Sequence, residues 1–543
     1  MPDASLPRTP HPWEAIYPAG VEWAAPIETG TLPALLDRAA ERFADLPALR
    51  FRSTRLSYAA FRARVDRLAA GLIADGLKPG DAVGLLLTNT AWHPIVFFAV
   101  LRAGGRLVHL TPLDPPRAIA RKLADSGAGM LITTDLPAVL PTAERLLAEG
   151  ACARLYVAAD AVWDDASAAS GMPDAQPLAV WPVVVPGDVA LLQYTGGTTG
   201  LPKAAMLSHA NLTAAVSMGQ VWALGQGTAL QPGDRVICVL PLFHIFALTS
   251  VLLRSLSGGA EILLLARFEV AAVLRAIEQD RATVFHGVPT MWTALANHPG
   301  IDACDLSSLR LVFSGGAPLP MEVVDRLEAL TGHRLTGGWG MTETSPVGCT
   351  LVPGRPYGPG EIGVPLPGIE VRIVSLDDPH IVLGAEATGE IAIRGLNVMQ
   401  GYWNRPDENA AAFVDGFFLT GDVGHMTAKG SFVLVDRKKD MILSGGFNVY
   451  PRVIEDAIYE HPDVAEAGVI GVADAYRGQS AKAFVVMRPG AAPLTLEALR
   501  SFLSERIGRH ELPAALELRD SLPKTPVGKL SRLQLATLPA QEP

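Results

Sequence analysis

Apolar residues in the first third of the chain follow two patterns in turn, a spacing of three or four residues and short continuous runs. After Ser57, residues three or four positions apart are apolar: Phe61, Val65, Leu68 and Leu72. This spacing predicts an amphipathic helix that Ser57 caps and Gly76 ends. Short apolar runs follow and predict strands over 83–87, 106–110 and 130–133. Strands separated by helices indicate a doubly wound, mostly parallel sheet of the α/β class.

A second series of strands and helices extends from Val189 to about residue 330, after a polar surface connection over 159–186. Beyond Gly337, glycine and proline become frequent, and alternating strands over 370–374 and 389–394 predict a β-rich subdomain over about 345–437. A charged run over 433–440 precedes a compact α+β tail. Its helices are expected over 452–461 and 496–507, and its strands over 467–472 and 483–487. We therefore predict a large domain over 1–437 and a small one over 438–543.

Composition narrows the classes of function. The chain has 543 residues, more than one core normally holds, and 49% are hydrophobic. Its formal net charge is −10, and no block of Lys and Arg resembles a nucleic-acid site, so nucleic acid is not an expected partner. The four cysteines lie far apart and form neither a disulfide framework nor a zinc motif, which favours a reduced, cytoplasmic setting.

Two further patterns concern the membrane. The N-terminus lacks the basic and apolar regions of a secretory signal. The most apolar later stretch, residues 245–253, is about half as long as a bilayer span. We expect a soluble protein without an integral membrane segment. A peripheral membrane association and a homodimer both stay open.

The strongest chemical signal is the segment Tyr194-Thr-Gly-Gly-Thr-Thr-Gly-Leu-Pro-Lys203. Glycines let a backbone curl around an anion with its N–H groups exposed, while hydroxyls and a lysine add donors and charge. The residues expected to hold a triphosphate are Thr195, Gly196, Gly197, Thr198, Thr199, Gly200 and Lys203. The segment is not a Walker A loop, because Pro202 precedes the lysine and Ala204 follows it.

Leu192-Gln-Tyr-Thr-Gly-Gly-Thr-Thr-Gly200 resembles the signature loop of the adenylate-forming superfamily, which includes acyl-CoA synthetases, luciferases and peptide-synthetase adenylation domains. Further motifs in family order extend the resemblance from about residue 32 to 533, nearest to bacterial medium- and long-chain fatty acyl-CoA ligases. The resemblance implies that ATP, Mg²⁺ and coenzyme A take part. It also implies two steps, in which an acid and ATP give acyl-AMP and pyrophosphate, and acyl-AMP and CoA then give acyl-CoA and AMP.

The same resemblance assigns an acyl pocket. Pro241-Leu-Phe-His-Ile-Phe-Ala247 is similar to the family's acyl-pocket segment, in which His244 acts as a gate beside the carboxylate. The residues expected to contact the acid are Phe243, His244, Phe246 and Met341. The segment lacks the Asp with which peptide-synthetase domains bind a substrate amine, so an amino-acid substrate is disfavoured.

Three motifs are similar to the family's nucleotide contacts. Phe313-Ser-Gly-Gly-Ala-Pro-Leu319 implies that Gly315, Gly316 and Ala317 lie beside adenine. In Gly337-Gly-Trp-Gly-Met-Thr-Glu343, Trp339 replaces the family's usual Tyr and would stack on adenine. Thr342 would hydrogen-bond the phosphate of the adenylate, and Glu343 would hold Mg²⁺. Asp422 and Arg437 resemble the ribose contacts.

The C-terminal motifs imply movement. Lys439 matches the hinge position about which the small domain swivels between the two steps. Gly445 and Gly446 resemble the residues that line the pantetheine tunnel. Lys529, in Pro523-Lys-Thr-Pro-Val-Gly-Lys529, matches the catalytic lysine that enters the site during adenylation.

Several alternatives remain at this point. The acid is expected to be a medium- or long-chain fatty acid, but dicarboxylic, branched short-chain and aryl acids stay open. Another acceptor, such as a carrier protein, would make the chain a loading enzyme. A protein of a different class, which binds nucleotides without catalysis, is disfavoured because Lys203, Glu343, Asp422, Arg437 and Lys529 are all retained.

Overall fold

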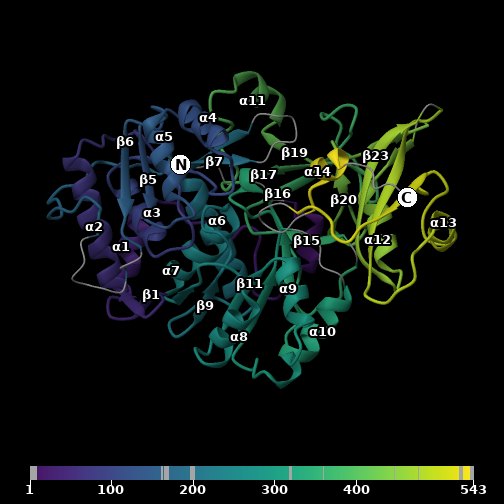
Figure 1. Cartoon of the computed structure of the whole chain (residues 1–543), viewed down its shortest axis with the longest axis horizontal. Helices are drawn as coiled ribbons and strands as arrows, with labels where there is room; N and C mark the ends of the chain where they lie inside the picture. Colours follow the sequence, from purple (N-terminus) through teal and green to yellow (C-terminus); the bar gives the residue numbers. More distant parts are fainter. Residues whose placement is uncertain are drawn as a thin grey trace.

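The structure is a computed structural model, and it describes residues 9–160, 163, 170–195, 202–316, 321–358, 360–445, 447–474, 476–524 and 530–538. Three sheets organise these residues. Two belong to the larger part of the molecule, and the third lies in a C-terminal unit beside it (Figure 1). Predictions for Gly196, Gly197, Thr198, Thr199, Gly200, Ala317, Gly446 and Lys529 fall outside the described residues.

The first sheet has the strand order β6-β5-β3-β4-β7-β8, in which every pair except β7 and β8 is parallel. Its strands are β3 (Ala82–Leu85), β4 (Arg106–His109), β5 (Met130–Thr134), β6 (Arg154–Ala158), β7 (Val189–Thr195) and β8 (Lys203–Ser208). The helices within this stretch are α3 (Trp92–Arg102), α4 (Pro116–Ser126) and α5 (Leu140–Ala148). Parallel strands joined by helices form a doubly wound sheet, as predicted.

The second sheet is parallel at one end and antiparallel at the other. Its first half contains β1 (Pro47–Phe51), the antiparallel edge strand β2 (Thr54–Ser57), β9 (Arg235–Cys238), β10 (Glu261–Leu264), β11 (Val284–Gly287), β12 (Leu311–Ser314) and β13 (Thr336–Trp339). Its antiparallel half contains β14 (Cys349–Thr350), β15 (Glu361–Pro365), β16 (Glu370–Val374), β17 (Gly389–Arg394), β18 (Phe413–Val414), β19 (Phe417–Met426) and β20 (Phe432–Arg437). Strand β13 pairs with β14, so the β-rich region continues the same sheet.

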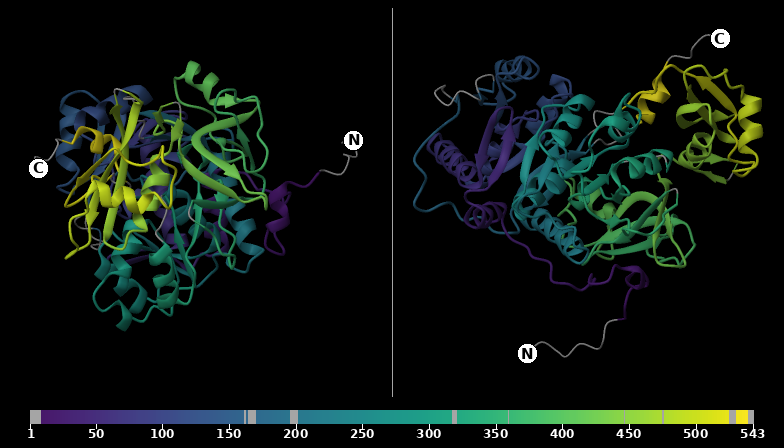
Figure 2. Two further views of the ribbon diagram at one scale, coloured as in Figure 1. Left: turned by 90° about the vertical axis from the view of Figure 1, so that its right-hand side faces the viewer. Right: turned by 90° about the horizontal axis from the view of Figure 1, so that it is seen from below.

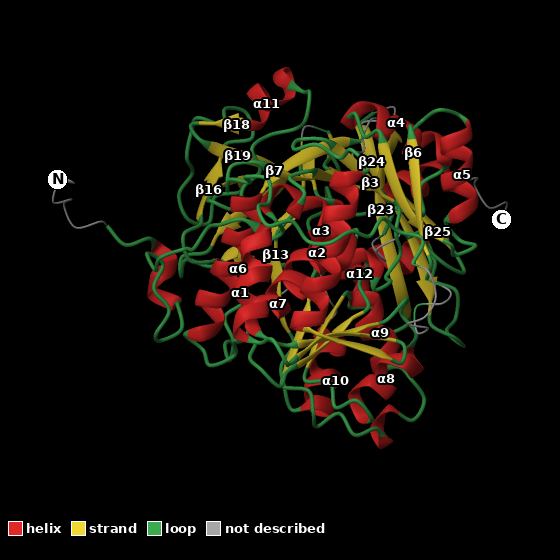
Figure 3. Ribbon diagram, turned by 90° about the vertical axis from the view of Figure 1, so that its left-hand side faces the viewer, coloured by secondary structure: helices red, strands yellow, loops and turns green. Residues whose placement is uncertain are grey.

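Helices fill the space between the two sheets and cover their outer faces (Figure 3). The inner layer contains α1 (Leu32–Arg42), α2 (Tyr58–Ala74), α3, α6 (His209–Leu224), the π-helix η2 (Ala247–Leu253) and α7 (Arg254–Gly258). Helices α8 (Val270–Glu278), α9 (Pro289–Ala296) and α10 (Met321–Thr331) cover the second sheet, while α4 and α5 cover the first. Shorter elements are η1 (Pro12–Ile16), η3 (Ile301–Ala303), η4 (Thr342–Thr344) and α11 (Pro406–Ala412).

One buried cluster explains this layering. It joins Val83 and Leu191 of the first sheet to Val236 and Ile262 of the second through apolar side chains of the inner helices. Both faces of each parallel sheet are therefore buried, which is why its strands are apolar without alternation.

The C-terminal unit stands beside the rest of the chain in the right-hand view of Figure 2. Its sheet has the order β22-β21-β24-β23, with β25 added to β24. The strands are β21 (Ile442–Ser444), β22 (Phe447–Val449), β23 (Val464–Asp474), β24 (Gly478–Met487) and β25 (Ala515–Leu518). The helices are α12 (Pro451–Tyr459), α13 (Leu496–Leu503) and α14 (Arg532–Thr537). Exposed side chains of Arg488 and Glu322 form an ion pair of 3.1 Å between this unit and α10.

The α/β fold class is confirmed, and most predicted elements occur close to their expected bounds. Ser57 caps α2 by accepting from the Ala60 N–H at 3.2 Å. Two differences from the predicted elements have local causes. Helix α13 ends at Leu503, where the Ser504 hydroxyl donates to the Ser501 carbonyl instead of the chain continuing as a helix. Strand β8 was not predicted, because hairpin pairing with β7 defines it rather than its own short sequence.

Candidate active site

A cavity of about 1220 Å³ lies where strands of both sheets end. Segments that follow the carboxyl ends of β7, β9, β12 and β13 line it, and the antiparallel strands β19 and β20 close another side. Ligands of open α/β sheets bind at carboxyl ends because the loops and side chains there converge. The cavity brings together Lys203, Glu343, Asp422 and Arg437, which lie far apart in the sequence.

Asp422 has a hydrogen-bond donor and an ion-pair partner. The Trp339 indole N–H donates to its Oδ2 at 2.7 Å, and the Arg437 guanidinium lies 3.4 Å from its Oδ1. Register explains the second contact, because Asp422 of β19 pairs directly with Arg437 of β20. The side chain is buried, so these contacts orient the carboxylate at the cavity wall. The sequence predicted Trp339 and Asp422 as separate contacts, and the hydrogen bond between them was not foreseen.

Glu343 lies in the short helix η4 that follows β13. Tyr402 donates its hydroxyl to Glu343 Oε1 at 2.9 Å. Burial raises the pKa of the Glu343 carboxyl, while hydrogen bonding and the charge of Arg437 act in the opposite sense. The turn into η4 requires a glycine at residue 340, because a Cβ there would lie 1.7 Å from the Pro346 carbonyl oxygen. This backbone constraint holds the carboxylate at the cavity.

Lys203 begins β8, and its ammonium forms an ion pair with Glu408. The same ammonium lies 5.1 Å from the centre of the Tyr402 ring. The Thr195 hydroxyl donates to the Lys203 carbonyl at 3.4 Å, which joins the two ends of the predicted phosphate loop. Residues 196–200, the centre of that loop, lie outside the described residues. The sequence motif therefore identified Lys203 but not its partner Glu408.

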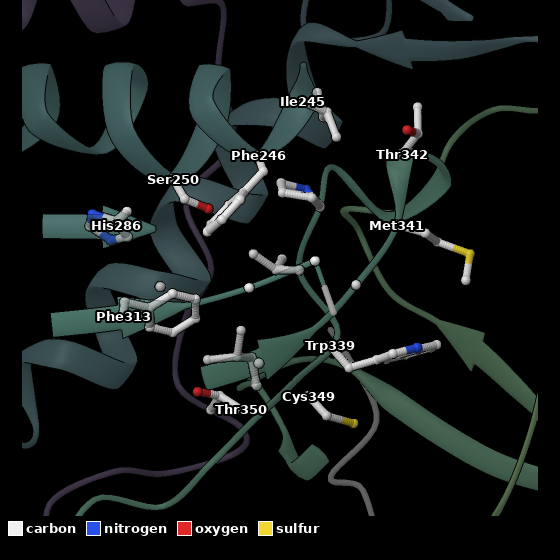
Figure 4. Close-up of a pocket in the computed structure, with 18 of the residues that line it drawn as sticks. Ile245, Phe246, Ser250, His286, Phe313, Trp339, Met341, Thr342, Cys349 and Thr350 are labelled. Carbon is white, nitrogen blue, oxygen red and sulfur yellow. The ribbon is translucent and has the colours of Figure 1, made fainter. Parts of the chain in front are cut away.

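The predicted acyl-pocket residues Phe243, His244, Phe246 and Met341 all line the cavity. Figure 4 shows Phe246 near Ser250, His286 and Phe313, with Met341 and Thr342 on another side of the pocket. Gly315 and Gly316 also line the cavity. A Cβ on Gly315 would lie 2.8 Å from the Phe246 ring, so this glycine gives space to the aromatic side chain.

Gln193 connects the two halves of the site. Its amide donates to the Phe243 carbonyl at 3.0 Å, and its Oε1 lies 2.9 Å from His109 Nδ1. Gln193 belongs to β7, two residues before the phosphate loop, so this side chain links that loop to the acyl-pocket segment. Neither Gln193 nor Tyr402 was predicted as a site residue, because each acts through partners that are distant in sequence.

The joint between the two parts of the chain also reaches the cavity. Lys438 pairs with Glu390 at 2.9 Å. Burial and then repulsion from Arg437 lower the pKa of the Lys439 ammonium, whereas Asp440, Asp422 and Glu343 act to raise it. Gly445 is exposed, has a positive φ of 59° and is not among the residues that line the cavity. The described conformation thus places Lys439, but not Gly445, at the cavity.

Comparison with known families identifies the chain. The profile of the AMP-binding enzyme family matches residues 36–403, and that of the AMP-binding enzyme C-terminal domain matches residues 453–529. The chain belongs to the AMP-binding enzyme family.

Relatives and solved structures agree with this assignment. A long-chain-fatty-acid–CoA ligase of Bacillus subtilis is 36% identical over 96% of this chain and 97% of its own. A feruloyl-CoA synthase of Amycolatopsis is 39% identical over 89% and 94%. The ATP-bound MatB of Rhodopseudomonas palustris superposes with a TM-score of 0.81, at 29% identity over 93% of this chain and 98% of that one. The chain is accordingly an AMP-forming acyl-CoA synthetase that uses ATP, CoA and a carboxylic acid.

Within the described ranges, no helix is long and apolar enough to cross a bilayer. Over the same residues, no group of three or more His, Cys, Asp and Glu side chains could hold a metal ion. All four cysteines are free.

Proposed function

We propose that this synthetase activates a medium- or long-chain fatty acid. Two observations support this acid. Relatives across nearly the whole chain are named long-chain-fatty-acid–CoA ligases. Apolar and aromatic side chains from several elements line the acyl side of the cavity: Trp222, Ile245, Phe246, Phe313 and Leu351. Such surfaces favour a hydrocarbon chain over a polar one.

In this proposal, the nucleotide side of the cavity holds ATP. Asp422 accepts hydrogen bonds from the ribose hydroxyls, with Arg437 beside it, and Trp339 offers its ring to adenine. Lys203 and the loop over 195–200 bind the phosphates. The observation that carries the proposal is the convergence of Lys203, Glu343 and Asp422 on one cavity.

Glu343 fits a role as a magnesium ligand. Its side chain is half-buried at the cavity, where partial desolvation disfavours the charged form, so a nearby cation would stabilise it. Mg²⁺ commonly takes only one or two carboxylates together with phosphate oxygens and water, so a single glutamate is sufficient. The bound ion would neutralise phosphate charge. Tyr402 would orient the Glu343 carboxylate by its hydrogen bond.

Adenylation requires no general base, because a carboxylate is already a nucleophile at neutral pH. Two anions must meet and pyrophosphate must leave, so the barrier is mainly electrostatic. Lys203, Thr342 and the phosphate loop would offset this charge, while His244 and Met341 position the acid. Lys529 would add a further positive charge to the transition state.

The second step requires a different arrangement of the C-terminal unit. We place the domain boundary at residues 437 and 438 and propose that Lys439 is the hinge. A rotation there would withdraw Lys529 and bring Gly445 and Gly446 toward the cavity to form the path for pantetheine. The contacts that this rotation would break include the exposed Arg488–Glu322 ion pair.

Separate assays of the two steps test this proposal. Pyrophosphate release would be measured with fatty acids of graded length and with ferulate, followed by AMP release with CoA present. We expect a fatty acid to give the highest kcat/KM. A clear preference for ferulate would overturn the fatty-acid assignment, and failure of every acid would overturn the function itself.

A further inference from the structure

The helix that follows the acyl-pocket segment presents one face to the cavity. Phe246, Ser250 and Arg254 are spaced four residues apart and all line it. Such spacing places side chains on one side of a helix. At the α-helical rise, eight residues correspond to roughly 12 Å along the helix axis. Figure 4 shows Ser250 beyond Phe246 as seen from Met341 and Thr342. Arg254 therefore lies farther from the nucleotide side than Phe246 does.

Arg254 lacks a counter-ion among the described residues. It forms no ion pair there, and its hydrogen bond with the Gly219 carbonyl is long, at 3.4 Å. A guanidinium carries five N–H donors, so most of its capacity remains unused within the described part of the chain. Burial lowers the pKa of Arg254 to about 10, and the group stays a cation at neutral pH. The part of its surface that remains accessible is consistent with its place in the cavity wall.

The surroundings of Arg254 are built for its side chain. Gly219 of α6 lies against the guanidinium, where an added Cβ would be 3.2 Å from Nε. His286 is also at the cavity, and burial together with the charge of Arg254 lowers its pKa to about 3. His286 Nδ1 and Gln226 Oε1 are buried without a hydrogen-bond partner among the described residues, and both residues line the cavity. This end of the acyl compartment is polar and carries net positive charge.

Most other cations at the cavity are paired, with Arg355 and Lys439 as exceptions among the described residues. Lys203 pairs with Glu408, Arg437 with Asp422, and Lys438 with Glu390. A buried cation without a partner is unfavourable, and an apolar side chain of similar length would pack at lower cost. A ligand that carries a negative charge would stabilise the Arg254 cation in this position.

We propose that the preferred acid carries a second anionic group at the end of the acyl chain remote from the activated carboxylate, and that Arg254 binds this group. This inference rests on the proposed function. The apolar walls hold the hydrocarbon body, and the guanidinium offers a two-donor fork that matches a carboxylate. An α,ω-dicarboxylic fatty acid has this chemistry and serves as the probe.

The test compares dicarboxylic acids with monocarboxylic acids of equal chain length, from six to sixteen carbons, by pyrophosphate release. We expect wild-type kcat/KM to favour the dicarboxylic acid by about tenfold or more at the best length. Arg254→Met should lower kcat/KM for the dicarboxylic acid by about 100-fold, because removing one member of a desolvated charge pair has a large effect. The same variant should raise kcat/KM for the monocarboxylic acid of equal length.

Four further measurements separate a binding role from a structural one. Arg145→Met removes an exposed arginine that pairs with Glu149 in α5, away from the cavity, and should leave the preference unchanged. A thermal shift without ATP should show that the dicarboxylic acid raises the Tm of wild type but not of Arg254→Met. Unliganded Arg254→Met should have an equal or higher Tm than wild type. Arg254→Lys, which keeps the charge, should retain part of the preference.

Several results would overturn the inference. They are a wild-type preference for monocarboxylic acids at every length, an unchanged preference in Arg254→Met, or no thermal shift by any dicarboxylic acid. If Arg254→Met does not fold, the inference is still tested by the wild-type preference for dicarboxylic acids and by their effect on the wild-type Tm. If no acid of either series gives pyrophosphate release, the proposed function itself is refuted.

Discussion

On the side of the cavity proposed for the nucleotide, three charged groups have protein partners: Asp422 contacts Trp339 and Arg437, Glu343 accepts from Tyr402, and Lys203 pairs with Glu408. On the acyl side, Arg254 has no acidic partner among the residues described. The two regions share one cavity, yet they differ in how their charges are satisfied.

This difference indicates two ways to prepare for a ligand. Paired groups keep a fixed orientation before ATP arrives, and a ligand that replaces a partner exchanges one favourable contact for another. An unpaired cation gains a new contact only from a ligand with the right charge. The first arrangement supports orientation of a co-substrate, and the second supports selection among acids.

The largest expected effect is on Glu343. Glu343→Gln keeps the size of the side chain and removes its charge, so a proposed ligand for the metal ion is lost. We expect adenylation to fall by roughly 10²- to 10³-fold, as for loss of one key transition-state contact. ATP–pyrophosphate exchange measures this step, with Glu370→Gln as a control, since this carboxylate of the edge strand β16 pairs with Arg394 and does not line the cavity. Near-normal exchange would show that the paired carboxylate is structural.

Trp339→Phe keeps an aromatic ring and removes the donor to Asp422. A hydrogen bond to a charged group contributes about 1.5–3 kcal/mol, so we expect kcat/KM for ATP to fall about 10- to 100-fold. The control is Trp403→Phe, whose indole N–H donates at 3.1 Å to the Asp125 carbonyl instead. Equal losses of kcat/KM for ATP in both variants would mean that the loss does not come from a changed orientation of Asp422.

Glu408→Gln tests whether pairing restrains Lys203. Both side chains are about one-third exposed, at 31% and 37%, and such ion pairs contribute up to about 1 kcal/mol. We expect KM for ATP to decrease by up to about fivefold, because Lys203 no longer has a competing carboxylate. Steady-state kinetics at two salt concentrations measure the change. An increase in KM would show that Glu408 positions Lys203 for ATP.

The smallest effect concerns stability and pH. Burial raises the pKa of Glu343 above its value in the unfolded chain, so the unfolded state loses this proton first as pH rises. Between the two pKa values the unfolded state binds fewer protons, and this group lowers stability as pH increases. Glu343→Gln should therefore gain Tm relative to wild type as the pH rises above 4.5, the ordinary pKa of a glutamate. Calorimetry across this range checks the sign, and a constant difference would contradict it.

Local sequence predicted much of the fold. Residues 370–374 and 389–394 form β16 and β17 with the predicted bounds. Ser57 caps a helix, as its position before an apolar periodic segment indicated. These predictions succeeded because helix and strand periodicity and capping depend on neighbours within a few residues.

The site was predicted as a set of residues but not as a set of contacts. Trp339 and Asp422 are separated by 83 positions, and Tyr402 and Glu343 by 59. Nothing local in the sequence says that these side chains meet. Their contacts depend on the loop after β13 and on strand register in the antiparallel half of the sheet.

By itself, then, the sequence determined the α/β class, the order of most elements and the motifs that we propose bind nucleotide. The tertiary structure alone decided the partners of Asp422, Glu343 and Lys203, and it placed Arg254 at the acyl side of the cavity. The physical reason is that periodicity and capping act over one or two turns, whereas charge pairing follows from how separate sheets and helices pack together.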